Sequence, residues 1–209
     1  MFQTKDLRKK YSTQKELIFP DISLATSDQL LIHGPSGCGK TTLLHLLCGI
    51  LTPTSGSIRF GNQEYSDLKG SNMDAFRGQN IGVCLQKPVF IKSLNSIENL
   101  MFSLHLAGKK PDKKHCENQM KALGIEHTMH QRTWSLSPGE QQRLMFLKAL
   151  IHRPKFIIAD EPSSSLDDIN AQAVIDLLIT QCKSSEAMLI VVSHDSRIKS
   201  AFTNQILLS

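Results

Sequence analysis

Residues 34–42 have the types and spacing of a phosphate-binding loop. The pattern G-x-x-x-x-G-K-[ST] is filled by Gly34, Gly39, Lys40 and Thr41. Glycines let backbone N–H groups approach an anion that a Cβ would keep away, the lysine brings positive charge to the β- and γ-phosphates, and the threonine hydroxyl suits Mg²⁺. The sequence therefore predicts a nucleoside triphosphate site formed by Gly34, Pro35, Ser36, Gly37, Cys38, Gly39, Lys40, Thr41 and Thr42, with Thr41 also a metal ligand.

Two further polar groups follow apolar runs. Asp160 and Glu161 end the run at residues 156–159, and His194 comes shortly after the run at 188–192. In an open α/β sheet, ligands bind at the carboxyl ends of the strands. Asp160 is suited to hold Mg²⁺, directly or through water, and Glu161 to polarise an attacking water. His194 could reach a γ-phosphate, or could be an ordinary histidine at a helix start.

Tyr11 stands in a polar, basic turn between strands expected at residues 2–7 and 17–24. An exposed aromatic ring at this place either stacks on a nucleotide base or packs on the edge of the sheet. The residues alone leave both open.

The elements that must position these groups alternate between strands and helices. Continuous apolar runs predict buried strands at residues 30–32, 81–85, 156–159, 188–192 and 205–208, with a shorter strand at 57–60. Helices should follow the phosphate loop and cover residues 169–182. We expect an α/β fold: a P-loop NTPase core with a mainly parallel sheet, an N-terminal antiparallel β portion and an inserted α-helical subdomain.

Residues 87–153 differ in character from the rest. Helical spacing is predicted at 97–106, at 116–123 and after Pro138-Gly139 up to residue 150, with a basic loop at 108–114. We expect one domain over residues 1–209, with approximately 87–153 as a helical subdomain inside it.

Composition limits the class of protein. The 209 residues contain 40% hydrophobic and 21% charged residues, which suits one soluble domain, and no apolar run approaches the ~20 residues of a membrane span. The N-terminus lacks the apolar core of a signal peptide. The five cysteines form no C-x-x-C pair, so they predict apolar fillers in a reducing compartment. We expect a cytoplasmic protein.

The net charge of +5 leaves an anionic partner open. Basic clusters lie at residues 8–10 and 109–114. They are explained most simply as solvated surface, while a membrane surface or nucleic acid is the alternative that composition cannot resolve.

Together, the motifs resemble those of the ATP-binding subunits of ABC transporters. Residues 34–42 resemble the Walker A motif, residues 136–143 (LSPGEQQR) the LSGGQ-type signature, and residues 156–162 the Walker B motif with its catalytic glutamate at Glu161. Gln86 is similar to the Q-loop glutamine, residues 164–167 to the D-loop, and His194 to the switch histidine. Tyr11 stands where the family has its adenine-stacking aromatic. These motifs occur in the family's order and span nearly the whole chain.

The resemblance implies an ATPase that works in pairs. Two cassettes would meet head to tail, as a homodimer or with a different second cassette, and bury ATP between the phosphate loop of one and Ser137, Gly139 and Glu140 of the other. It also implies catalytic roles for Glu161, His194 and Gln86, and Mg²⁺ held by Thr41, Gln86 and Asp160.

The partner implied is an integral membrane permease. Residues 87–105 would dock on it, through a hydrophobic stretch that includes Val89 and Phe90. The subunit would then sit peripherally on the inner face of the cell membrane, with no direct contact to nucleic acid. Residues 54–56, 86 and 96–100 are most similar to the lipoprotein-release, macrolide-export and cell-division branch.

Some residues depart from the family pattern. Pro138 replaces the first signature glycine, and Cys84-Leu85 precede Gln86 where an aromatic is more usual. Because the sequence stops at Ser209, we expect no C-terminal regulatory extension. Two alternatives remain: a soluble ABC-type ATPase acting on ribosomes or DNA, and a P-loop nucleotide kinase, against which the signature and Gln86 argue.

Overall fold

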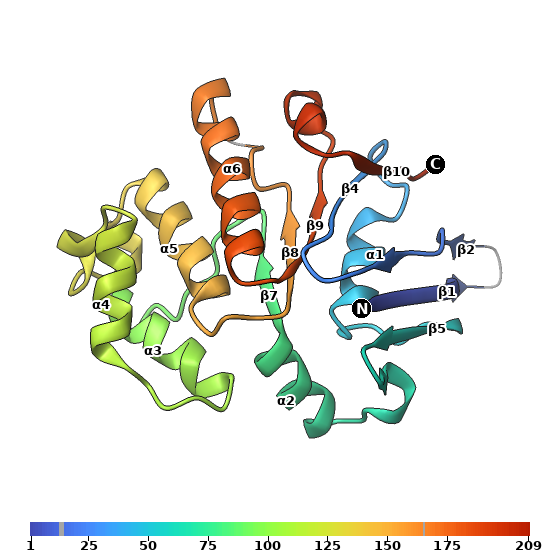
Figure 1. Ribbon diagram of the computed structural model, residues 1–209, viewed down its shortest axis with the longest axis horizontal. Helices are drawn as coiled ribbons and strands as arrows, with labels where there is room; N and C mark the ends of the chain where they lie inside the picture. The colour runs from blue at the N-terminus through green and yellow to red at the C-terminus, as the bar shows by residue number, and fades with distance from the viewer. Residues whose placement is uncertain (13–14, 165) are drawn as a thin grey trace.

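The computed structural model describes residues 1–12, 15–164 and 166–209. A parallel sheet of order β10-β4-β9-β8-β7 lies at its centre (Figure 1). Its strands are β4 (Gln29–His33), β7 (Ile81–Cys84), β8 (Phe156–Asp160), β9 (Met188–Val192) and β10 (Asn204–Leu207). Every residue of β9 is buried, and so is every residue of β8 before Asp160. This is the pattern of a parallel sheet covered on both faces, and it confirms the predicted fold class.

A second, antiparallel sheet has the order β2-β1-β5-β6, with β3 also paired to β1. Its strands are β1 (Phe2–Ser12), β2 (Lys15–Ile18), β3 (Ser23–Leu24), β5 (Ser55–Phe60) and β6 (Gln63–Glu64). The predicted end of the first strand at residue 7 was wrong. The chain continues to Ser12 because Arg8, Lys9 and Lys10 pair with β2. Tyr11 therefore lies in a strand and not in a turn.

Helix α1 (Lys40–Leu47) lies between the two sheets, and α5 (Pro138–Leu150) and α6 (Asp168–Ser184) cover the other face of the parallel sheet (Figure 1). Successive side chains of β4 point to opposite faces of the parallel sheet, as in any strand. Ile32 joins the core that contains the leucines of α1, whereas Leu31 packs with Phe146 of α5 and Leu178 of α6. The loop between β4 and α1 is thereby fixed at both ends.

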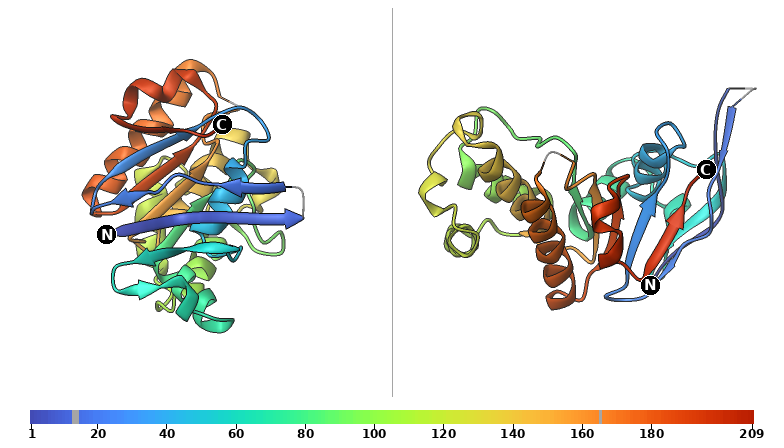
Figure 2. Two further views of the ribbon diagram at one scale, coloured as in Figure 1. Left: turned by 90° about the vertical axis from the view of Figure 1, so that its right-hand side faces the viewer. Right: turned by 90° about the horizontal axis from the view of Figure 1, so that it is seen from above.

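Residues 87–153 form a mostly helical region at one end of the molecule, with the antiparallel sheet at the other end (Figure 2, right). It contains α3 (Ser96–Leu106), α4 (Lys113–Ala122), α5 and the short 3-10 helices Glu126–Thr128 and Thr133–Ser135. A hydrophobic core of its own holds these helices together, including Leu100, Met120 and Leu144.

One helix was not predicted. Helix α2 (Ser71–Asn80) precedes β7. Met73 and Phe76 pack partly buried against the core, but none of its residues is fully buried, so its apolar pattern is too short to predict a helix. The remaining 3-10 helices are Tyr65–Asp67 and Ser196–Ala201.

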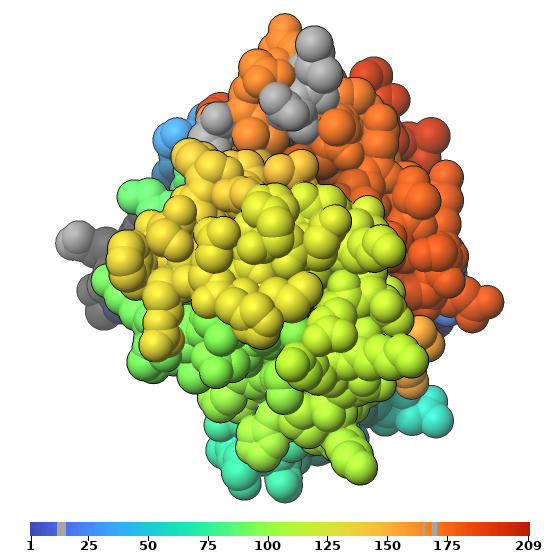
Figure 3. Space-filling view, turned by 90° about the vertical axis from the view of Figure 1, so that its left-hand side faces the viewer, coloured from blue at the N-terminus to red at the C-terminus, as the bar shows by residue number. Residues whose placement is uncertain are grey.

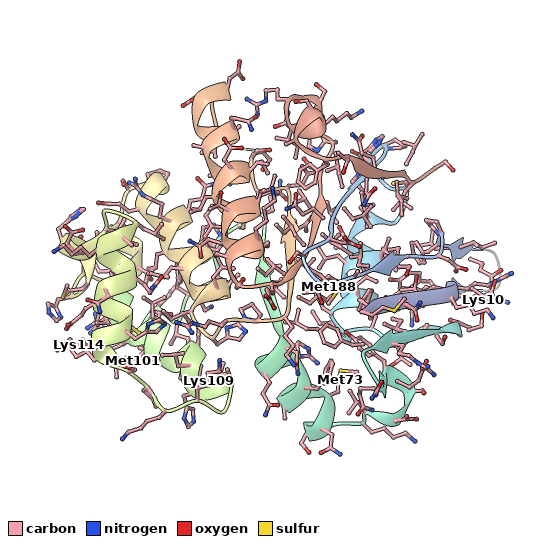
Figure 4. The ribbon with its side chains drawn as sticks, in the orientation of Figure 1. Lys10, Met73, Met101, Lys109, Lys114 and Met188 are labelled. Carbon is pink, nitrogen blue, oxygen red and sulfur yellow. The ribbon has the colours of Figure 1, made fainter. Side chains whose placement is uncertain are left out.

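The two basic clusters lie far apart. Lys10 stands at the end of the antiparallel sheet, while Lys109 and Lys114 stand at the opposite end of the molecule, beside α3 and α4 (Figure 4). The clusters therefore do not combine into one anion-binding surface. The five cysteines are free thiols, as predicted, and all except Cys38 are buried.

Candidate nucleotide-binding site

The phosphate loop (residues 34–42) connects β4 to the N-terminus of α1, and two of its glycines are required by geometry. Gly39 caps α1 with φ at 100°, a conformation that favours glycine. A Cβ on Gly34 would lie 2.3 Å from the Leu208 carbonyl oxygen, because the chain after β10 passes directly against the loop. The backbone is thus shaped before any ligand arrives.

Lys40 is folded over this loop. Its ammonium donates hydrogen bonds to the Gly34 carbonyl oxygen at 2.7 Å and to the Pro35 carbonyl oxygen at 2.9 Å. Both partners are neutral, so an incoming phosphate can replace them with a stronger charge-assisted contact. Lys40 is therefore held where the pattern requires a phosphate-binding cation.

A cavity of about 440 Å³ opens beside the loop and collects residues from every motif of the cassette except the signature and the D-loop. We call it the nucleotide cavity. Its lining residues are Tyr11, Leu17, Ser36, Gly37, Gly39, Lys40, Thr41, Thr42, Gln86, Asp160, Glu161 and His194. Gly34, Pro35 and Cys38 belong to the loop but do not line the cavity.

Tyr11 stands at the rim of this cavity with its side chain 56% exposed. Its hydroxyl lies 3.1 Å from the Thr42 hydroxyl, and the Lys9 ammonium lies 5.9 Å from the centre of its ring. The ring is therefore oriented next to the phosphate loop and not packed away on the sheet edge, which favours base stacking.

The oxygen donors in the cavity fit a magnesium ion. Burial, and then the neighbouring Glu161, raise the pKa of the Asp160 carboxyl, while His45 and Lys40 act in the opposite direction. A cation bound nearby would stabilise the charged carboxylate. The hydroxyl of Thr41, the amide of Gln86 and the carboxylate of Asp160 are all hard donors of the kind that Mg²⁺ takes.

Glu161 is held in a strained and almost fully buried position. Its φ of 48° is unusual for a residue other than glycine. The Ser193 hydroxyl donates to its Oε2 at 2.7 Å, and His194 Nδ1 lies 2.6 Å from its Oε1. Since a carboxylate can only accept, Nδ1 carries the proton in this contact. The structure thus joins Glu161 to His194 directly.

Ser193 is a member of this cluster that the sequence did not single out. The only signal was its place between the apolar run of β9 and His194. Arg197 was not singled out by the sequence either. Its guanidinium donates to Asp195, which follows His194, and to Asp168 and the Leu166 carbonyl oxygen, so it links the segment after β9 to the start of α6. Of the predicted D-loop, residues 164–167, Ser165 lies outside the described residues.

The signature segment (residues 136–143) begins just before α5 and does not line the nucleotide cavity, although Gln142 near its end donates to the Pro162 carbonyl oxygen beside Glu161. Ser137 is the N-cap, with extended backbone at φ −61° and ψ 157°, and Pro138 is at the first turn. Ser137, Pro138 and Gly139 are exposed. Among the described residues that line the nucleotide cavity, Ser137, Gly139 and Glu140 are not found. This chain therefore does not bring its own signature to its own phosphate loop.

The parallel sheet, the loop before α1 and the acidic end of β8 define a P-loop protein that binds and hydrolyses a nucleoside triphosphate. A profile described as ABC transporter matches residues 20–164. The chain belongs to the ABC transporter family and is an ATPase that powers transport.

Two curated relatives show how much of the chain the similarity covers. The lipoprotein-releasing system ATP-binding protein LolD of Legionella pneumophila (strain Lens) is 35% identical over 90% of this chain and 83% of its own length. LolD of Hydrogenovibrio crunogenus is 34% identical over 98% of this chain and 92% of its own length.

Solved structures agree with this assignment. A dimer of the ATP-binding cassette MJ0796 in a post-hydrolysis state, bound to ADP and Pi, superposes with a TM-score of 0.89 at 25% identity, covering 100% of this chain and 94% of that one. CbiO1 of Clostridium perfringens, part of a cbiONQ transporter complex, gives a TM-score of 0.86 at 26% identity, covering 100% and 84% of the two chains.

Proposed function

We propose that this chain acts as one of two cassettes that bury ATP between them and drive a separate membrane permease. The observation that carries the proposal is the separation of the two halves of the site. The nucleotide cavity is lined by residues from most motifs, but Ser137 and Gly139 are exposed at the start of α5, outside it. A second cassette, turned head to tail, would bring these residues to the phosphates.

The start of α5 suits this role chemically. The N–H groups of a first helical turn are open to an anion, and the helix dipole favours negative charge there. Pro138 lacks an N–H, but it occupies the first turn, where such a donor is least needed. The N–H of Gly139 remains available to a γ-phosphate, whereas the Ser137 hydroxyl donates to Glu140 and must turn away from it to reach one.

The residues of the nucleotide cavity would have different roles in ATP binding and hydrolysis. Glu161 would orient the attacking water, and His194, already hydrogen-bonded to it, would contact the γ-phosphate. Thr41, Gln86 and Asp160 would hold Mg²⁺, which neutralises charge on the β- and γ-phosphates when bound. Tyr11 would stack on the adenine.

A groove of about 490 Å³ between α2, β7, α3 and α5 is a suitable dock for a permease segment. Its wall is largely apolar and includes Leu85, Val89 and Leu106, of which Val89 is 58% and Leu106 57% exposed. Large apolar side chains exposed together are typical of protein interfaces. Phe90, by contrast, packs against two hydrophobic cores, so Val89 is the better probe of docking.

Two basic groups mark the polar side of this groove. Burial lowers the pKa of Lys148, and it lowers the pKa of His152 to about 4. Both ring nitrogens of His152 are buried without a hydrogen-bond partner within the described chain. A permease segment with apolar side chains would fill the groove.

The names of the curated relatives favour a permease of a lipoprotein-releasing system. This subunit would bind to it peripherally, on the inner face of the cell membrane. The names favour such a partner over the alternative of an ATPase that acts on ribosomes or DNA. Within the part of the chain that the structure describes, no helix is long and apolar enough to cross a bilayer.

The pairing is tested with Glu161→Gln, which keeps the phosphate-binding groups but should slow hydrolysis. Gel filtration at saturating ATP should show the variant as a dimer and the wild type mainly as a monomer. Lys40→Ala added to Glu161→Gln is the matched control and should stay monomeric. A Glu161→Gln protein that remains monomeric, or hydrolyses ATP at the wild-type rate, would contradict the proposal.

Docking is tested with Val89→Asp, using co-purification of membrane proteins from solubilised membranes and mass spectrometry of the partner. The variant should lose its permease partner while the isolated subunit hydrolyses ATP at the wild-type rate. Lys114→Asp, on the outer side of α4, is a control that should retain the partner. Retention by both variants would exclude the groove.

A further inference from the structure

Glu140, the third residue of α5, carries a negative charge at the place where the proposed function requires a phosphate to bind. Its carboxylate accepts from the Ser137 N–H at 2.8 Å and from the Ser137 hydroxyl at 2.7 Å, both through Oε2. The capping box that results satisfies the helix end. The hydrogen bond to Glu140 also uses the hydroxyl proton that Ser137 would otherwise donate to a γ-phosphate.

His127, from a different segment, binds the other oxygen of the same carboxylate. Its Nε2 lies 2.7 Å from Glu140 Oε1. Because a carboxylate has no proton to give, Nε2 must be the donor. The pKa of Glu140 is lowered to about 2, first by the hydroxyl and N–H of Ser137 and then by His127. Glu140 is therefore a charged acceptor shared by two partners.

The backbone around His127 is well anchored. It lies in the 3-10 helix Glu126–Thr128, between Ile125, which is fully buried, and Thr128, whose hydroxyl donates to the Ile125 carbonyl oxygen at 2.7 Å. Ile125 packs in the same core as Leu136, the residue before Ser137. The two segments form one continuous surface, shown in yellow in Figure 3. The His127 side chain itself is 59% exposed, so burial does not explain it.

These contacts define a competition for one proton. When a phosphate approaches, the Ser137 hydroxyl must turn its proton from Glu140 to the phosphate oxygen. A carboxylate that already accepts a hydrogen bond from His127 is a weaker competitor, and its charge repels the phosphate less. Without His127, Glu140 would hold the Ser137 proton more strongly.

We propose that His127 is a positioning residue for the trans ATP contact, which acts through Glu140 to release the Ser137 hydroxyl to the γ-phosphate of the partner cassette. The inference rests on the proposed pairing of two cassettes. It assigns a role to a residue outside all the motifs of the chain.

The test measures the ATP concentration that gives half-maximal dimerisation, in a Glu161→Gln background. His127→Ala should raise this concentration about 5- to 10-fold, equivalent to about 1–1.4 kcal/mol. His127→Gln, whose amide can still donate to Glu140, should stay within about two-fold. His130→Ala, at an exposed histidine of the same segment, is the matched control and should leave the value unchanged. ATP binding to the isolated cassette, measured in a Ser137→Arg background, should be the same with and without His127→Ala.

A second background separates positioning from a general structural role. In Glu140→Gln, where no carboxylate competes for the Ser137 proton, His127→Ala should change the dimerisation value by less than about two-fold. An equal loss in both backgrounds, or no loss in either, would overturn the inference while leaving the pairing intact. If the Glu161→Gln reference does not dimerise at all, the proposed function fails and the inference falls with it.

Discussion

The two halves of the proposed ATP site are built in opposite ways. The phosphate loop is shaped by the protein's own structure: Gly34 packs against the Leu208 carbonyl, Gly39 adopts a left-handed conformation, and Lys40 is folded onto the loop. The N-terminal end of α5, which carries the signature, is exposed, and it is capped within the same helix by Glu140, which accepts from the Ser137 N–H. One half is a cavity, and the other is a surface.

This difference indicates where binding energy must come from. A preformed cavity can bind ATP within one chain, because its donors and its shape are already in place. A capped, exposed helix start gains little from a free nucleotide, since water already solvates it. It becomes useful only when a second chain presents a phosphate whose other side is already held. The following predictions separate the two halves.

The largest effect is expected at the phosphate-loop half. Lys40→Ala should weaken ATP binding by at least about 100-fold, because it removes the charge-assisted contact to the phosphates. Fluorescence titration with an ATP analogue measures this. Lys110→Ala, an exposed lysine outside the cavity, should bind as the wild type does. Binding within about three-fold of the wild type would show that Lys40 does not hold the nucleotide.

At the exposed half, a bulky charge should block hydrolysis without affecting the first binding step. Ser137→Arg should reduce steady-state ATPase activity by more than about 50-fold, while binding of ATP to the isolated chain changes by less than about two-fold. The assay should include the permease if the isolated chain is slow. A parallel loss of binding would mean that the two halves are not separate.

Pro138 is expected to be neutral at this position. A proline ring favours an extended conformation for the residue before it and is common at a helix start, and the structure has both at Ser137 and Pro138. Pro138→Gly should therefore leave ATPase activity within a few-fold of the wild type. A wild type that lacks activity and gains it through Pro138→Gly would instead identify Pro138 as an attenuating residue.

At the phosphate-loop half, a smaller effect than that of Lys40→Ala is expected at the rim of the cavity. Tyr11→Ala should weaken ATP binding about 5- to 10-fold, in the range of ~1–3 kcal/mol measured for stacking on a base. Tyr11→Phe keeps the ring but loses the contact to Thr42, and should bind within about two-fold of the wild type. If Phe were as weak as Ala, the hydroxyl and not the ring would be the important group.

The features that the sequence predicted best are the buried strands and the turns that require glycine. The strand expected at 188–192 is the strand observed, because a short continuous apolar run is typical of a strand that is buried on both faces of a parallel sheet. The place of the loop between a strand and a helix was also predicted, because Gly34 and Gly39 stand where a close contact and a positive φ favour glycine. Helix α2 was missed because its apolar pattern is limited to the partly buried Met73 and Phe76.

Side-chain partnerships were also beyond the sequence. Ser193 bonds Glu161 across 32 positions of the chain, and His127 bonds Glu140 from a separate segment. Such contacts depend on how the core places two loops relative to each other, and no local sequence pattern predicts that placement. The length of β1 depended in the same way on its pairing with β2.

The central claim, that each ATP is shared between two chains, is tested most directly by mixing two inactive variants. Lys40→Ala retains a signature but lacks a working phosphate loop, and Ser137→Arg has the reverse defect. Each alone should be inactive, but a mixed dimer contains one intact shared site, so the mixture should recover a substantial fraction of the wild-type ATPase rate. A mixture no faster than the sum of its two components would contradict the account.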